Sequence, residues 1–109
     1  MSYPTQDLRV SLVQGDTRWH DPEANRAHYA ALIAPLAGAT DVVILPETFT
    51  SGFSNEAGDG AEGMDGPTLA WMRGQAAALE AVVTGSVQLQ VDGQVFNRLL
   101  WVQPDGVVQ

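Results

Sequence analysis

The pattern of apolar and polar positions opens with a strand and a helix. Residues 8–14 are rich in strand-forming side chains, and the segment from about Glu23 to Leu36 carries apolar residues at helical spacing. Asp21 and Pro22 are a typical helix start, because the carboxylate can cap free N–H groups and proline lacks the N–H that a first turn leaves unpaired. The apolar stripe of this predicted helix consists of Tyr29, Ile33 and Leu36.

A second strand and a second helix follow. Residues 41–45 form a short apolar run of the kind that parallel sheets bury on both faces. Residues 46–65 show no periodicity, and a loop of that length inside a compact domain is usually functional. Gly66 and Pro67 then predict a helix start. The buried face of this helix is expected to hold Leu69, Met72, Ala76 and Leu79.

The remaining residues predict a hairpin and the start of a further strand. Asp92-Gly93 is a strong two-residue turn signal between the strand-like runs 82–91 and 94–102, and residues 107–108 begin another strand. The order β-α-β-α-β-β contains two crossovers, which favour a mixed α/β sheet with both helices on one face. Because the strands carry apolar residues on both sides, the other face must also be covered.

Length and composition fit one ordinary globular domain over residues 1–109. The hydrophobic content is 45% and the mean hydropathy is −0.04, which argues against disorder. No apolar run approaches the roughly 20 residues that span a bilayer. The first residues also lack the basic and apolar segments of a secretory signal. We therefore expect a cytoplasmic protein.

Charge and cysteine content exclude several classes of partner. Thirteen acidic and five basic residues give a net charge of −8, which repels nucleic acid and anionic membranes. The chain contains no cysteine and only two histidines, so neither a disulfide nor a structural zinc site of the usual ligands is expected.

Glu47 follows a predicted buried strand, and ligands of open α/β sheets bind beyond the carboxyl ends of strands. Its position alone favours a solvated acid in a loop. Residues 45–54 read Leu-Pro-Glu-Thr-Phe-Thr-Ser-Gly-Phe-Ser. This stretch resembles the signature around the catalytic glutamate of the nitrilase superfamily, the carbon-nitrogen hydrolases. More narrowly, it is similar to the omega-amidase branch, which releases ammonia from monoamides of dicarboxylic acids such as 2-oxoglutaramate.

The resemblance implies an α-β-β-α sandwich, a Glu-Lys-Cys triad, no cofactor and no metal. Glu47 would be the general base of that triad, but the chain contains neither lysine nor cysteine. Residues 95–109 resemble the strand, turn and strand that lead to the family's lysine. We therefore expect the amino-terminal portion of a single hydrolase domain, inactive alone. The full-length protein would act on a small-molecule amide and form a homo-oligomer through the sandwich.

Other side chains near Glu47 have two interpretations. Phe49 and Phe53 could line a substrate pocket, although core packing beneath the loop is favoured. Burial of the Glu47 carboxyl among them would suit a general base. Arg98 could bind an anionic substrate group, although an ion pair with one of the many acids is favoured. By the resemblance, Asn97 is expected to brace a neighbouring loop.

Two alternatives to an omega-amidase stay open. The chain could be a non-catalytic α/β binding module of the same descent, which would have to hide its apolar sheet face, for example by dimerising. It could also belong to a nitrilase or carbamoylase of the same superfamily with another substrate.

Overall fold

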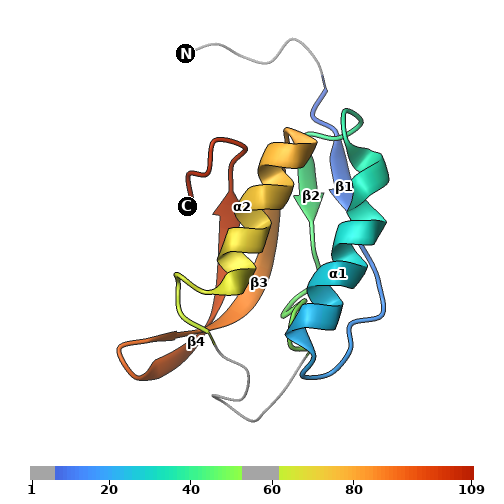
Figure 1. The fold of residues 1–109 in the computed structure, drawn as a ribbon. Helices are drawn as coiled ribbons and strands as arrows, with labels where there is room; N and C mark the ends of the chain where they lie inside the picture. Colours follow the sequence, from blue (N-terminus) through green and yellow to red (C-terminus); the bar gives the residue numbers. More distant parts are fainter. Residues whose placement is uncertain (1–6, 53–61) are drawn as a thin grey trace.

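The computed structural model describes residues 7–52 and 62–109 and contains a four-stranded sheet with two helices (Figure 1). The strand order is β1-β2-β3-β4, in which β1, β2 and β3 are parallel and β4 is antiparallel to β3. The elements are β1 (Val10–Leu12), α1 (Pro22–Ile33), a 3₁₀ turn η1 (Ala34–Leu36), β2 (Val42–Ile44), α2 (Pro67–Leu79), β3 (Val82–Val91) and β4 (Gln94–Val102). The predicted mixed α/β sheet is thereby confirmed.

Both helices cover the same face of the sheet, as the two crossovers predict (Figure 1). The residues that the sequence assigned to the buried face of α2 all lie in the core, and so do Tyr29 and Ile33 of α1. The core between helices and sheet also contains Val43, Leu45, Phe49, Ala81, Val83, Val87, Leu89, Leu100 and Val102.

Helix α1 begins and ends where its local chemistry requires. The Asp21 carboxylate accepts a hydrogen bond from the backbone N–H of Ala24 at 3.2 Å, and Pro22 occupies the first turn. The α-helix stops at Ile33, and the predicted last turn is the 3₁₀ turn that contains Pro35, since proline cannot supply an α-helical N–H.

Helix α2 lacks a capping side chain at its N-cap, Gly66, and the carboxylate of Glu62 replaces it. Glu62 Oε1 accepts from the backbone N–H of Thr68 at 2.6 Å, and Glu62 Oε2 accepts from the Thr68 hydroxyl at 2.8 Å. A Cβ at position 66 would lie 2.8 Å from Glu62 Oε1, so glycine leaves the space that this cap needs. The cap therefore comes from outside the helix.

The β3–β4 hairpin forms at the predicted turn. Asp92 and Gly93 both have positive φ values, 52° and 78°, which suit a turn whose twist matches the two strands. The register pairs Ser86 with Leu99 and Gln88 with Asn97. After β4 the chain turns back, and Val108 forms a bridge to Val102.

The second face of the sheet exposes apolar side chains from β1 and β4, whereas β3 contributes the polar Thr84, Ser86 and Gln88 to it. Side chains alternate along a strand, so the neighbours of core residues in β3 and β4 point away from the helices. Leu12 of β1 at 79% and Leu99 of β4 at 70% exposure are the most open apolar side chains on this face, and Trp101 follows Leu99 by two residues on the same side of β4. The sequence predicts that this face is covered, and residues 7–52 and 62–109 do not cover it.

Within the described residues, no helix has the length and apolar content needed to cross a membrane.

An ion pair at the amino end of the sheet links β1 to β2. The Arg9 guanidinium donates to Asp41 at 3.0 and 3.3 Å, and the Arg9 backbone N–H donates to the same carboxylate at 2.8 Å. These hydrogen bonds hold the pKa of Asp41 below its ordinary value of 3.8. Because the pKa of Asp41 is lower in the folded state, the pair stabilises the fold at pH values above the ordinary pKa. This stabilisation is lost as the pH falls through the folded pKa.

We predict that Asp41→Asn lowers the thermal unfolding midpoint at neutral pH, and that the difference from wild type vanishes in acid, because the protonated Asp41 no longer attracts Arg9. Unfolding midpoints of both proteins, measured from about pH 7 to about pH 2, check this. A difference that stays constant across the range would contradict it.

Candidate functional site

Glu47 lies just beyond the carboxyl end of β2. Leu45 still bonds to the neighbouring strand, where its N–H donates to the Thr84 carbonyl at 2.8 Å. The chain then leaves the sheet through Pro46, and Glu47 follows at the end of the sheet where the parallel strand β1 also has its carboxyl end. Open parallel sheets bind ligands at this end.

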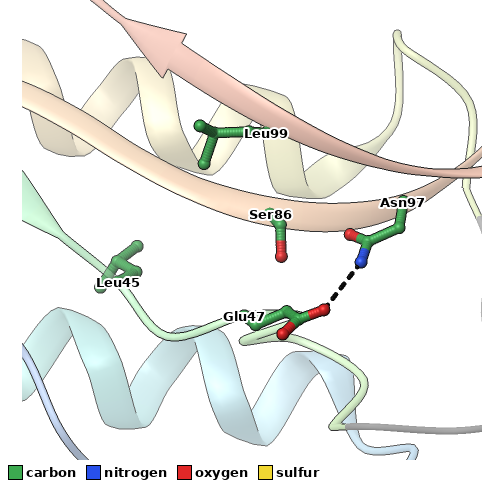
Figure 2. Close-up of a pocket in the computed structure, with 5 residues that line it drawn as sticks. All are labelled: Leu45, Glu47, Ser86, Asn97 and Leu99. Carbon is green, nitrogen blue, oxygen red and sulfur yellow. Dashed lines mark hydrogen bonds between the residues drawn. The ribbon is translucent and has the colours of Figure 1, made fainter.

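The Glu47 side chain lines a pocket of about 320 Å³ together with Leu45, Ser86, Asn97 and Leu99 (Figure 2). Ser86 and Leu99 are a cross-strand pair on the face that points away from the helices, so the pocket opens on the uncovered face. The Asn97 amide Nδ2 donates to Glu47 Oε1 at 3.0 Å. This bond engages Oε1, and within residues 7–52 and 62–109 no hydrogen bond reaches the other carboxylate oxygen, Oε2.

The surroundings of Glu47 differ from the expected burial among phenylalanines. The Glu47 side chain is exposed, whereas Phe49 is fully buried. Phe49 lies against Tyr29 and Trp71, with ring centroids 5.9 and 5.6 Å away, and is not among the residues that line the pocket. Phe53 lies outside the described residues.

Thr48 explains why Glu47 and Phe49 point to opposite sides. Two residues that are i and i+2 in an extended chain share a side, but Thr48 between them is left-handed, with φ of 46°. This conformation is costly for a β-branched residue and persists only when its surroundings fix it. The Thr48 N–H donates to Ser86 Oγ at 2.8 Å, and the Thr48 carbonyl accepts from Ser51 and Gly52. The turn therefore directs the carboxylate into the pocket and the ring into the core.

Gly85 lets this loop approach β3 closely. A Cβ at position 85 would lie 3.0 Å from Leu45 Cβ and 3.1 Å from Phe49 Cδ1, both closer than ordinary contact. The Gly85-Ser86 pair therefore serves the loop twice, since the glycine supplies space and the serine supplies the hydroxyl that receives Thr48.

The sequence pointed to some of these partners and missed others. Asn97 was expected to brace a neighbouring loop, and its amide binds the carboxylate of Glu47 in that loop. Ser86 was missed, although the small, polar Gly85-Ser86 pair interrupts the apolar strand 82–87 and was a usable signal. Asn25 was also missed. It lies four residues before Tyr29, on the same face of α1, and its polar side chain is fully buried.

Arg98 and His20 lie outside the pocket. The Arg98 guanidinium carbon sits 5.1 Å from the centre of the Phe96 ring, and Arg98 forms no ion pair within residues 7–52 and 62–109. The favoured ion pair is thus replaced there by a cation–π contact. His20 stacks on Trp19 at 3.8 Å, and its backbone N–H donates to the Ser51 carbonyl at 2.7 Å.

Comparisons with known proteins agree with the fold and the motif. The sequence model of the carbon-nitrogen hydrolase family matches residues 9–109. Omega-amidase YafV of Escherichia coli strain K12 is 38% identical over 101 residues, which cover 93% of this chain and 39% of that protein.

Solved structures give the same result. A CN-hydrolase superfamily protein of Xanthomonas campestris, whose crystal structure holds an arsenic adduct in the active site, is 68% identical with a TM-score of 0.92, and the match covers 96% of this chain and 40% of that one. Nit3 of Saccharomyces cerevisiae, a nitrilase superfamily member, is 20% identical with a TM-score of 0.78 over 93% of this chain and 41% of that one, and supports the fold alone. The chain thus spans about two fifths of the length of these relatives.

We predict that Ser86→Ala destabilises the fold by about 1–3 kcal/mol, because the buried Thr48 N–H loses its acceptor. Urea unfolding measures the loss. Ser11→Ala is the matched control, since the Ser11 hydroxyl donates at 2.8 Å to Thr40 Oγ1 at the other end of the sheet, and Thr40 keeps its bonds to backbone carbonyls. A smaller loss for Ser86→Ala than for Ser11→Ala would contradict the role of Ser86.

Proposed function

The chain belongs to the carbon-nitrogen hydrolase family, and from this premise we propose that it is the Glu47-bearing, amino-terminal portion of a single amide-hydrolysing domain. The observation that carries the proposal is the pocket at the carboxyl end of β2, in which the Asn97 amide orients the Glu47 carboxylate. The share of the relatives that the chain covers and the exposed apolar side chains on the uncovered sheet face also support it.

In the proposed reaction, Glu47 is the general base. Its carboxylate oxygen Oε2 takes the proton from a cysteine thiol that the rest of the domain supplies, and the thiolate attacks the amide carbon. The proton then passes to the leaving amine, which departs as ammonia, and leaves an acyl-cysteine. Glu47 next deprotonates a water that hydrolyses this thioester, and the thiol is restored. A lysine from the same part of the domain stabilises the oxyanion.

The position of the pocket supports this division of roles. Glu47 opens on the sheet face that the helices leave free, so a covering layer can bring a thiol to the carboxylate without displacing the core. The Asn97 bond keeps one oxygen in place during proton transfer, and general bases act best when they are held within hydrogen-bond reach of the proton.

For the substrate we propose a monoamide of a small dicarboxylic acid, of the 2-oxoglutaramate type. The support is the likeness to omega-amidase YafV. Rates of the full-length protein on such a monoamide, on a simple aliphatic amide, on a nitrile and on a carbamoylated amine separate the omega-amidase from other members of the superfamily. A faster rate on any of the last three would contradict this choice.

We predict that Glu47→Gln in the full-length protein lowers kcat for ammonia release by about 10²- to 10⁴-fold, since a neutral amide cannot accept the thiol proton. The matched control is Glu80→Gln. Glu80 is the exposed C-cap residue of α2, just before β3, and lies at the opposite end of the sheet from Glu47. Its kcat should equal that of wild type. A fall of less than about tenfold for Glu47→Gln in folded protein would remove the general-base role.

We also predict that the purified 109-residue chain releases no ammonia from a monoamide, because it contains no thiol for Glu47 to activate. An ammonia assay at high protein concentration tests this. Turnover above that of a Glu47→Gln chain would show that another nucleophile operates.

A further inference from the structure

Asn25 joins the loop of residues 15–20 to the loop that carries Glu47, at the carboxyl end of the parallel strands. Although polar, it is 0% exposed. Its Oδ1 accepts from the Arg18 backbone N–H, and its Nδ2 donates to the carbonyls of Arg18 and Thr50, with all three distances at 2.7 Å. Both amide protons and the amide oxygen are thus used, and a buried side chain that is fully satisfied holds its partners in one geometry.

The loop of residues 15–20 is held from the same helix face. Tyr29 follows Asn25 by one helical turn, and its hydroxyl bonds to Thr17 and donates to the Gly15 carbonyl at 3.3 Å. A second link joins this loop to the loop of Glu47, because the His20 N–H donates to the Ser51 carbonyl. Asn25 and His20 therefore hold the Glu47 loop at two adjacent carbonyls, those of Thr50 and Ser51.

The link from Thr50 to Glu47 is short. Thr50 lies inside the turn in which Ser51 and Gly52 donate to the Thr48 carbonyl, at 3.2 and 2.8 Å. The left-handed residue Thr48 starts that turn and directly follows Glu47. Releasing the Thr50 carbonyl frees the far end of the turn, and the strained conformation of Thr48 then has fewer contacts to maintain it.

We propose that Asn25 is a positioning residue for Glu47, which it aims into the pocket by anchoring the Thr50 carbonyl. The proposal rests on the general-base function proposed for Glu47. Asn25 itself does not line the pocket, so it acts through the loop and not on the substrate. A misplacement of a catalytic group by about 1 Å can cost about 10²-fold in rate.

Asn25→Asp in the full-length protein is the first test. The variant keeps the shape and the acceptor for Arg18 but replaces the donor group with an oxygen that repels the Thr50 carbonyl. Asn25→Ala, which leaves room for a water, is the second variant if the first does not fold. The matched control is Thr40→Val, because Thr40 is 2% exposed and its hydroxyl bonds to backbone carbonyls and Ser11 at the opposite end of the sheet.

Two readouts are needed, both corrected for the folded fraction. We expect Asn25→Asp to lower kcat by about tenfold or more with KM little changed. We also expect its backbone amides in residues 47–52 to exchange hydrogen for deuterium faster, while those of β3 exchange as in wild type. Thr40→Val should change neither kcat nor exchange in residues 47–52.

The outcomes separate this proposal from the proposed function. Unchanged kcat, or unchanged exchange in residues 47–52, in both Asn25 variants would overturn the positioning role while the amidase function stands. An equal loss of kcat in Thr40→Val would also overturn it, because it would reduce the effect to general destabilisation. If the wild-type protein releases no ammonia from any of the amides, the proposed function fails, and the exchange data still decide whether Asn25 holds the loop.

Discussion

The hydrogen bond from the Thr48 N–H to Ser86 Oγ is the contact on which the geometry of the site depends. Thr48 is a β-branched residue in a left-handed conformation, and an isolated loop would not hold it there. This bond joins the loop to β3 at Thr48, and the side chains before and after Thr48 point to opposite sides of the loop. Because they do, Phe49 completes the core while its near neighbour Glu47 reaches the open face of the sheet. The same turn therefore determines both the packing of Phe49 in the core and the orientation of the Glu47 carboxylate.

Much of the fold follows from local rules that the sequence displays. The Asp21-Pro22 start of α1, the Asp92-Gly93 turn and the apolar stripe of α2 each depend on neighbours in the chain, and the structure confirms all of them. Glu47 was found from its place after a strand and from the motif around it. Its role as a base is a proposal that these features support.

The parts that the sequence did not predict depend on contacts between distant segments. Glu62 caps α2 from outside the helix, Ser86 receives the amide of Thr48, and Asn25 joins two loops. None of these pairings has a spacing rule, since each depends on how the crossovers bring the segments together. The expected burial of Glu47 is not seen within residues 7–52 and 62–109, for a related reason. Phe49 predicted an apolar setting, but the left-handed Thr48 directs the carboxylate away from that ring.

The hairpin has a consequence for the order in which the pocket assembles. Ser86, Asn97 and Leu99 all lie on β3 and β4, whose two-residue turn lets the strands meet by closing a very short loop. Such pairing takes on the order of microseconds, whereas joining β2 to β3 requires a long crossover through α2. We expect the wall of the pocket to be formed early in folding and the acid to dock onto it late. The segment that carries Glu47 would then also be the first to detach when the native state opens locally.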